Sequence, residues 1–534
     1  MIAMTLAEVA AAIGVPVPPG QGDVVVRSVE FDTRRVTAGA LFVALRGEHT
    51  DGHALAPDAA AAGAVAVLGS APIAGDLPLL QVGVDLAAAD DSPTDAADDA
   101  GNLAVLQALA ALAHASVTAL VREHGLEVIG VTGSSGKTST KDLIAAVLRS
   151  GAAGTDPATR LAHDPVVAPP ESFNNELGHP YTALRADENT RYLVLELSAR
   201  GIGHVAMLAG VAPPRIGAVI NVGSAHIGEF GSVQAIAKAK SELVSALPAA
   251  TDGGVAILNA DDPLVAAMAA VTTAEVVTVG RSPGAQLRAE NVTQDDADRA
   301  AFTLVTPEGS AQVALRVVGA HQVGNALTAA AVGRAVGLTV EAVAAGLSGA
   351  QASSKWRMQL TELAGGITLV NDAYNANPHS MKAALRSLSI IGRGRRSWAV
   401  LGEMAELGPE TNSAHDEIGR LVVRLGIERL IVVQGPGGAT GAAVGGRTGA
   451  RALHLGAHLE GSWGGESELV AGIDDAVEIL ESELAEGDVV LVKASRSAGL
   501  ERVALRLIAD LGEATENPQR VLQPHRPIGD GAAR

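Results

Sequence analysis

Residues 132–138 have the composition of a loop that binds nucleotide phosphates. They read Thr-Gly-Ser-Ser-Gly-Lys-Thr, follow an apolar run, and precede apolar residues at helical spacing. A strand–loop–helix unit of this kind turns backbone N–H groups and the positive end of a helix dipole toward a phosphate. Lys137 would meet the outer phosphates and Thr138 would bind Mg²⁺, although Val131 replaces the first glycine of the common pattern. We therefore expect a phosphate site formed by Gly133, Ser134, Ser135, Gly136, Lys137, Thr138 and Ser139.

Two polar residues that follow later apolar runs are candidate metal ligands. Glu196 ends the run Tyr-Leu-Val-Leu-Glu, and His226 lies just past another run. Ligands of open α/β sheets bind at the carboxyl ends of the strands, and Mg²⁺ prefers oxygen ligands. We therefore expect Thr138, Glu196 and His226 to hold metal. For Glu196 the alternative is an ordinary edge carboxylate or helix cap. A lone histidine is usually structural, so only its place in the pattern makes His226 a candidate.

These residues must be positioned by more than one folded unit. A chain of 534 residues is too long for one hydrophobic core and suggests about three domains. Residues 1–115 contain short apolar runs, residues 116–350 alternate apolar runs with helical patterns, and residues 351–515 repeat that alternation. This alternation predicts mostly parallel sheets, the second of them Rossmann-like. Residues 516–534 contain three prolines and few apolar residues, so we expect a disordered tail.

Three biased stretches interrupt this pattern. Residues 87–102 are acidic and are interpreted as a solvated insertion or linker. Residues 150–172 are rich in Ala, Gly and Pro and are expected to form a loop. Residues 435–449 are rich in glycine but lack a lysine and a strand–helix setting. We interpret them as a flexible linker rather than a second phosphate site.

Composition excludes several functional classes. The net charge of −20 argues against a general nucleic-acid binder, since such proteins need a basic surface. The chain has no cysteine, which excludes disulfides and thiolate chemistry. We find no long apolar run that indicates a membrane span and no basic start typical of a signal peptide. We therefore expect a cytoplasmic monomer that is not inserted in a membrane.

A series of motifs across nearly the whole chain resembles the Mur ligase family of ATP-dependent amide-bond-forming enzymes. In chain order the motifs are Thr132-Gly-Ser-Ser-Gly-Lys-Thr138, Asn174-Asn-Glu-Leu-Gly-His-Pro180, the strand ending at Glu196, Asn221-Val-Gly-Ser-Ala-His226, Ala237-Lys-Ala-Lys-Ser-Glu242, Asn259-Ala-Asp-Asp-Pro263 and Gly319-Ala-His-Gln-Val-Gly-Asn325. Any one of them is weak evidence, but their order and spacing are very specific.

Motifs at both ends of the chain are similar to one branch of this family. Residues 371–378 and 401–408 resemble the branch that adds D-alanyl-D-alanine to a UDP-muramoyl-tripeptide. The Asp-Asn-Pro-Arg tetrapeptide typical of the diaminopimelate-adding branch is absent. Residues 28–34 and 41–47 resemble the UDP-binding module, in which Ser28, Thr33 and Arg34 would contact the substrate. The resemblance implies a small α/β UDP-binding domain, a central parallel-sheet P-loop-type ATPase domain and a C-terminal Rossmann-like ligase domain.

The resemblance also implies a mechanism and roles for individual residues. The carboxylate of UDP-N-acetylmuramoyl-tripeptide would attack the γ-phosphate of ATP, and the amine of D-alanyl-D-alanine would then displace phosphate from the acyl phosphate. The implied cofactors are ATP and Mg²⁺. The implied catalytic residues are Lys137, Glu196, His226, Lys240 and Arg357, of which Lys240 matches a lysine that many relatives carry as a carbamate. A solvated, ordinary Lys240 is the alternative. The implied nucleotide contacts are His321, Asn325, Asp372 and Tyr374, and the implied substrate contacts are Asn174, Asn175, Asn377, Lys493 and Arg496.

The sequence departs from the family pattern at a few positions and leaves other functions open. Ser198 and Ala494 each replace a glycine, and Ala168 or Pro169 stands where a threonine is usual. None of these changes removes a proposed charged group. A sister ligase that adds a single amino acid is the nearest alternative function. A non-catalytic nucleotide-binding module is the alternative from another class, and the retained charged residues argue against it.

Overall fold

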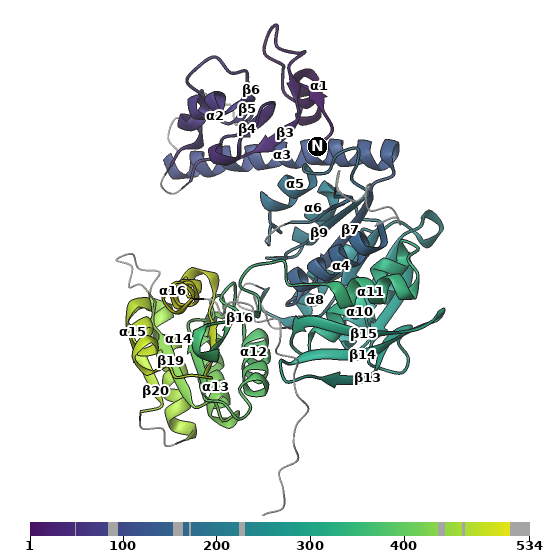
Figure 1. The fold of residues 1–534 in the computed structure, drawn as a ribbon. Coiled ribbons are helices and arrows are strands. Elements are labelled where there is room, and N and C mark those ends of the chain that lie inside the picture. The colour runs from purple at the N-terminus through teal and green to yellow at the C-terminus, as the bar shows by residue number, and fades with distance from the viewer. Residues whose placement is uncertain are drawn as a thin grey trace, which may run out of the picture.

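The computed structural model describes residues 1–47, 50–83, 94–152, 164–169, 172–223, 230–435, 444–461 and 465–512. Within these residues the chain forms three α/β units, each built around its own main sheet (Figure 1). Most strand pairs are parallel and carry buried Val, Leu, Ile and Ala, as expected for sheets covered on both faces. The predicted three-domain α/β architecture is confirmed.

The N-terminal unit contains a parallel sheet with the strand order β3-β4-β5-β6 and a small antiparallel pair of β1 with β2. Helix α1 begins with a capping box, in which the side chains of Thr5 and Glu8 each accept the other residue's backbone N–H. The elements are β1 (Met4–Thr5), α1 (Leu6–Ile13), β2 (Val25–Val26), β3 (Ser28–Glu30), β4 (Ala40–Val43), α2 (Ala56–Ala62), β5 (Ala64–Gly69) and β6 (Leu79–Gln81), with 3₁₀ turns at Thr33–Arg35 and Gly52–Leu55.

Helix α3 (Thr94–His124) connects the N-terminal unit to the central unit and runs beneath the N-terminal sheet (Figure 1). Its stretch Asp99–His124 is long and apolar enough to cross a membrane. The apolar window of 18 residues within it has a mean hydropathy of 1.8, and 44% of that window is buried inside the structure. The buried residues Val105, Leu109 and Leu112 belong to a core shared with both units. Our expectation that no long uncharged run exists is therefore wrong, and the packing explains the run as a core helix.

The central unit contains a nine-stranded sheet with the order β15-β14-β13-β12-β11-β10-β7-β9-β8, parallel except for the β13–β14–β15 pairs. Helices α4, α10 and α11 pack together over a core of aliphatic residues. The strands are β7 (Glu127–Thr132), β8 (Val166–Val167), β9 (Tyr192–Glu196), β10 (Ile216–Val219), β11 (Val255–Asn259), β12 (Glu275–Gly280), β13 (Leu287–Gln294), β14 (Arg299–Thr306) and β15 (Gly309–Val318). The helices are α4 (Lys137–Ala152), α5 (Gly178–Ala183), α6 (His204–Val211), α8 (Val233–Ser245), α9 (Pro263–Ala266), α10 (Gln322–Ala335) and α11 (Val340–Gly349), with 3₁₀ turns at Ala250–Asp252 and Ala267–Val271.

The C-terminal unit contains a six-stranded sheet with the order β16-β17-β21-β18-β19-β20, in which only β16 is antiparallel. The strands are β16 (Gln359–Glu362), β17 (Thr368–Asn371), β18 (Ser397–Leu401), β19 (Arg429–Val433), β20 (Ser467–Val470) and β21 (Val489–Lys493). The helices are α12 (Pro378–Ile391), α13 (Thr411–Arg424), α14 (Val444–Glu460), α15 (Ile473–Glu483) and α16 (Glu501–Leu511), with 3₁₀ turns at Ala364–Gly366, Gly408–Glu410 and Arg496–Ala498. Because β17, β21 and β18 are parallel neighbours, the segments that follow them meet at one edge of the sheet.

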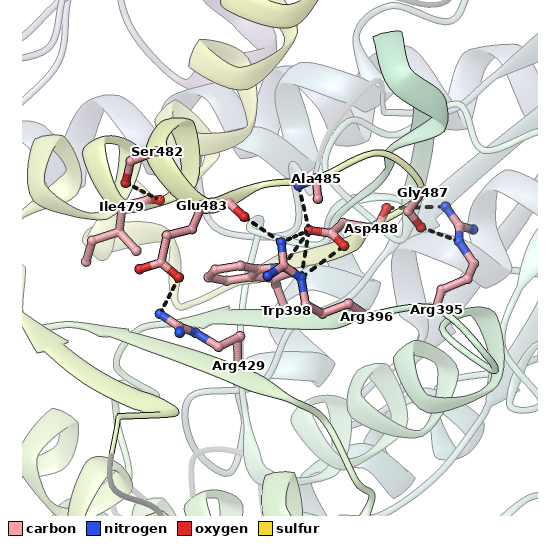
Figure 2. Close-up of polar contacts among 10 residues, drawn as sticks. All are labelled: Arg395, Arg396, Trp398, Arg429, Ile479, Ser482, Glu483, Ala485, Gly487 and Asp488. Atoms are coloured by element: carbon pink, nitrogen blue, oxygen red, sulfur yellow. Dashed lines mark hydrogen bonds and ion pairs between the residues drawn. The ribbon is translucent and has the colours of Figure 1, made fainter.

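A buried polar network fixes the start of β21 (Figure 2). The Asp488 carboxylate accepts hydrogen bonds from Arg396 at 2.6 Å and from the Trp398 indole N–H at 3.0 Å. The Trp398 ring also lies against the guanidinium groups of Arg396 and Arg429, 5.0 and 4.8 Å from the ring centroid. Such a fully paired carboxylate sets the position of its strand. The opposite end of β21 delivers Lys493 to the site described below.

Side-chain contacts join the units. Between the N-terminal and central units, the Tyr181 hydroxyl donates to Glu30 at 2.9 Å, and the Tyr181 ring packs edge-on against Phe31. Between the central and C-terminal units, the Ser387 hydroxyl on α12 donates to the buried carboxylate of Asp298 at 2.6 Å. Burial raises the pKa of Asp298, mainly because the charged form loses its hydration.

Several predictions about the biased stretches need correction. The acidic stretch is helical from Thr94 onward, so from there it is part of α3 rather than an insertion. The glycine-rich stretch becomes helix α14 at Val444, which is incompatible with a linker over its full length. The stretch 150–172 contains the end of α4 and strand β8, while its residues 153–163 and 170–171 lie outside the described residues. The predicted tail, 516–534, also lies outside them.

Candidate active site

The predicted phosphate loop connects strand β7 to helix α4, as the sequence pattern indicated. The Asn221 side chain, which follows β10, accepts the backbone N–H groups of Ser134 and Ser135 at 3.0 Å each and donates to the Ser135 carbonyl at 3.0 Å. Gly136 has a φ of 83°, and a Cβ there would lie 2.8 Å from the Asn325 side chain. Glycine at this position therefore lets the loop pack closely against α10.

The Lys137 ammonium folds back onto the loop and donates to the Gly133 carbonyl at 2.8 Å. Burial lowers the pKa of Lys137 most, the positive charge of Arg357 lowers it further, and the negative charge of Glu196 raises it. The charges of Glu196 and Arg357 therefore both act on the Lys137 ammonium, although the three residues come from three separate segments of the chain.

A buried carboxylate lies beside the loop at the end of β9. Glu196 is fully buried, and its Oε2 accepts the Thr138 hydroxyl at 3.2 Å and the Asn174 amide at 3.4 Å. Its other oxygen, Oε1, is buried without a hydrogen-bond partner in the described part of the chain. Buried carboxylate oxygens are normally paired, so an unpaired one beside a threonine hydroxyl fits a hard cation such as Mg²⁺. His226, the third predicted ligand, lies outside the described residues.

Ser172 joins the loop to the segment between the central and C-terminal units. Its hydroxyl lies 2.8 Å from the Thr138 hydroxyl and accepts the Arg357 guanidinium at 2.7 Å. Arg357 also lies over the Tyr374 ring, 4.3 Å from its centroid. The sequence analysis did not select Ser172, and the only available signal was its position directly before the Phe-Asn-Asn motif.

Lys240 is a buried amine on α8. Its side chain is 4% exposed, and it has no hydrogen-bond or ion-pair partner among the residues that the structure describes. Burial holds the pKa of Lys240 well below its usual value, and the neighbouring charge of Lys137 lowers it further. The alternative of an ordinary solvated lysine is therefore wrong.

The predicted nucleotide contacts also lie between the phosphate loop and the strand ends of the C-terminal unit. His321 directly precedes helix α10, and burial lowers its pKa to about 4, so the imidazole is neutral near pH 7. The Asn325 amide donates to Gln322 at 2.8 Å. Asp372 follows β17 and pairs with the Lys493 ammonium at 2.5 Å.

The predicted substrate contacts of the C-terminal unit already have protein partners. Arg496 pairs with Glu501 at 2.7 Å and lies over the Trp356 ring. The Asn377 side-chain oxygen Oδ1 accepts the backbone N–H of Ser380 at 2.9 Å, so this residue caps helix α12. Both residues nevertheless line the cavity described next.

A cavity of about 610 Å³ brings most of the predicted residues together. The predicted residues that line it are Ser134, Ser135, Gly136, Lys137, Thr138, Ser139, Asn174, His321, Asn325, Arg357, Asp372, Tyr374, Asn377, Lys493 and Arg496. It lies between the phosphate loop and the C-terminal strand ends, and its size suits a nucleotide with a second ligand.

The remaining predicted residues that the structure describes, among them Gly133, Glu196 and Lys240, are not part of the lining of this cavity. Ser28, Thr33 and Arg34 lie in the N-terminal unit, where the exposed Arg34 pairs with Asp32 at 2.8 Å. Asn175 accepts the backbone N–H of Gly178 at 2.9 Å at the start of α5.

Three family models match the chain, in the order of its three units. They are described as Mur ligase family, catalytic domain, over residues 25–117, Mur ligase middle domain, over residues 131–333, and Mur ligase, glutamate ligase domain, over residues 356–496. The resemblance inferred from the motifs is confirmed.

Individual proteins match over nearly the whole length. The UDP-N-acetylmuramoyl-tripeptide--D-alanyl-D-alanine ligase of Mycobacterium leprae (strain TN) is 47% identical over 96% of this chain and 99% of its own. A crystal structure of MurF from Acinetobacter baumannii, 25% identical, superimposes with a TM-score of 0.74 over 95% of this chain and 99% of that one. MurF ligase from Thermotoga maritima in complex with ADP, 24% identical, shares the fold with a TM-score of 0.67 over 91% and 98% of the two chains.

Proposed function

The chain belongs to the Mur ligase family, and we propose that it joins D-alanyl-D-alanine to UDP-N-acetylmuramoyl-tripeptide in an ATP-dependent step of peptidoglycan synthesis. The observation that supports this chemistry is one cavity that is lined both by the phosphate loop and by Arg357, Asp372 and Lys493, which follow the central unit in the chain. The choice of substrates is supported by the near full-length identity with ligases of that name.

In the proposed reaction the tripeptide carboxylate attacks the γ-phosphate of ATP. An oxygen–phosphorus bond forms, the bond to the β-phosphate oxygen breaks, and ADP leaves. The dipeptide amine then attacks the acyl carbonyl, phosphate leaves, and the amine protons pass to phosphate and solvent. A carboxylate approaching a polyphosphate brings like charges together, so the first step requires fixed positive charge. Lys137 and Arg357, which both line the cavity, supply it.

We propose that Thr138 and Glu196 hold Mg²⁺ and that His226 contributes to the same metal site. The fit rests on the buried, unpaired Glu196 Oε1 beside the Thr138 hydroxyl. Bound Mg²⁺ would neutralise phosphate charge at the reacting centre.

We also propose that Lys240 is carbamylated. Only the neutral amine reacts with CO₂, and burial beside Lys137 lowers the pKa of Lys240 and so favours that form. The Lys240→Ala variant should be inactive and partly recover with short carboxylic acids that occupy the same space. Restored activity would support the carbamate, while an active variant without added acid would contradict it.

The three units receive separate tasks in this proposal. Residues 1–115 bind the UDP-muramoyl part through Ser28, Thr33 and Arg34, although helix α3 continues past residue 115. Residues 116–350 bind ATP and residues 351–515 bind the dipeptide. We propose that the enzyme works as a cytoplasmic monomer, since its substrates in this role are soluble.

Phosphate release by the purified chain tests the proposed function. With ATP, Mg²⁺ and UDP-N-acetylmuramoyl-tripeptide, we expect turnover with D-alanyl-D-alanine and none with diaminopimelate. Turnover with the single amino acid alone would identify a sister ligase instead. The Lys137→Ala variant should lose turnover and keep its fold, whereas Lys238→Ala, at an exposed position on α8, should retain both.

A further inference from the structure

Lys141 on helix α4 is a buried cation that is not part of the lining of the cavity. Its side chain is 2% exposed, and its ammonium pairs with the carboxylate of the neighbouring Asp142 at 2.5 Å. Lysine is rarely buried to this extent without partners, because the ammonium loses its hydration. The proposed reaction gives Lys141 no task, so the remaining contacts of its ammonium indicate what the buried charge does.

The Lys141 ammonium holds two segments that lie outside α4. It donates to the Pro169 carbonyl at 2.6 Å and to the Ser354 hydroxyl at 3.3 Å. The Asp142 carboxylate adds a further bond, because it accepts the backbone N–H of Ser354 at 3.1 Å. All three donors of the ammonium group therefore have an acceptor, and one turn of α4 holds both segments.

Each of these segments leads to a side chain beside the phosphate loop. Ser172 comes three residues after Pro169, and Arg357 comes three residues after Ser354. The two side chains meet, since the Ser172 hydroxyl accepts the Arg357 guanidinium at 2.7 Å. The Ser172 hydroxyl also lies 2.8 Å from the hydroxyl of Thr138, in the first turn of α4. Helix α4 thus contacts the two segments twice, once through the buried lysine and once at the candidate active site.

We propose that Lys141 is a positioning residue that holds the contact between Ser172 and Arg357 beside the phosphate loop. The inference rests on the proposed function, because it explains how that reaction obtains the positive charge of Arg357 in the right place. Catalysis by a fixed charge requires that the charge is held where it acts before the reaction begins. The Lys141 ammonium fixes both segments shortly before they meet and so leaves Arg357 little freedom to move away from Ser172.

The Lys141→Met variant removes the ammonium and keeps a similar volume. With all substrates at saturation, we expect kcat to fall about 10- to 100-fold, as for loss of a hydrogen bond to a charged group. The Kd for ADP, measured by calorimetry, should change less than about twofold, because the phosphate loop itself is unchanged. Lys382→Met, which removes a lysine–carboxylate pair on α12 outside the cavity, is the matched control and should behave like the wild type.

A double variant with Ser172→Ala separates positioning from general damage. If Lys141 acts through the contact of Ser172 with Arg357, Lys141→Met should lower kcat less than about twofold further once Ser172→Ala has broken that contact. Losses that multiply in the double variant would overturn the proposal, because the two residues would then act independently.

Hydrogen exchange gives a readout besides activity. The N–H of Met358, which donates to Asp372 at 3.0 Å, should exchange faster in Lys141→Met, because the linker before it is released. Exchange in strand β18, which lies away from the linker within the same unit, should stay at the wild-type rate. An unchanged rate at Met358 would contradict the positioning role.

Ser354→Ala covers the case in which Lys141→Met does not fold. This variant removes only the linker hydroxyl and leaves the Lys141 ammonium paired with Asp142 and Pro169. We expect kcat to fall about 2- to 10-fold, again with almost no further loss beside Ser172→Ala. A wild-type kcat for Ser354→Ala would refute the role of Lys141.

The proposed function and the role of Lys141 fail in distinguishable ways. If the wild type does not turn over D-alanyl-D-alanine, the proposed function fails. If the wild type turns it over and Lys141→Met keeps its kcat, only the role of Lys141 is refuted.

Discussion

Replacing Lys240 by methionine should make the protein more stable and inactive at the same time. The Lys240 side chain is 4% exposed, has no partner among the described residues, and lies close enough to Lys137 for that charge to lower its pKa. Below the ordinary lysine pKa, burial of Lys240 costs stability, at about 1.4 kcal/mol for each unit by which its pKa is lowered, and methionine of similar volume has no such cost. At about 2–4 °C per kcal/mol for a domain of this size, the thermal midpoint near pH 7.5 should rise measurably. Turnover should fall about 100-fold or more, since the proposed carbamate could no longer form.

The pH dependence of this difference identifies its cause. The pKa of Lys240 is lower in the folded protein than in the unfolded chain, so between the two values the unfolded chain binds one more proton. The stability of the wild type therefore rises with pH throughout that window, by about 1.4 kcal/mol for each pH unit. The advantage of Lys240→Met should shrink by the same amount and vanish as the pH reaches the ordinary lysine value.

Thermal unfolding at pH 7.5, 8.5 and 9.5, in degassed buffer without divalent cations, measures this dependence while the amine stays unmodified. Lys238→Met, the same substitution at an exposed position on the same helix, should show no pH-dependent difference from the wild type. A stability difference for Lys240→Met that is constant across this range, or a destabilised variant, would refute the reasoning.

Three further substitutions test contacts around the cavity. Ser172→Ala should lower kcat/KM about 10-fold or more, because the linker arginine loses its partner beside the phosphate loop, and steady-state kinetics will measure this. Tyr181→Phe should remove the hydrogen bond to Glu30 at a cost of about 1 kcal/mol and raise the KM for the UDP-linked substrate; unchanged thermal stability would contradict it. Ser495→Ala should leave the Ala405 N–H unpaired and weaken dipeptide binding by inhibition assay, with ADP affinity unchanged in calorimetry.

Local patterns were sufficient to predict much of the fold. Residues 351–515 were predicted to alternate apolar runs with helices, and strands β17 and β18 are two of those runs, because short Val- and Leu-rich runs between polar turns suit buried parallel strands. Composition misled at residues 94–102, where acidic residues suggested a linker. That stretch forms the start of α3, whose later residues pack into a core shared by two units. The acidic composition gives no indication of this packing, because the packing partners of α3 lie in distant parts of the chain.

The candidate site was predictable where one segment supplies both the geometry and the chemistry. The phosphate loop is such a segment, because its strand, glycines and helix lie together in the sequence. Ser172 was missed for a different reason. The importance of Ser172 comes from contacts with Thr138 and Arg357, which lie far from it in the chain, and a single serine carries no signal of that.

The contacts of Arg357 link the candidate active site to the arrangement of the central and C-terminal units. Arg357 lies between Trp356 and Met358, whose φ values of 58° and 49° are unusual for residues with side chains. The linker is fixed on one side by the Ser354 N–H, which donates to Asp142 on α4 at 3.1 Å, and on the other by the Met358 N–H, which donates to Asp372. The helix that begins at the phosphate loop and the strand end that pairs with Lys493 therefore hold the same short segment. We expect Arg357 to reach Ser172 only when both attachments are made, so that the positive charge that phosphoryl transfer requires is complete only with the C-terminal unit in place.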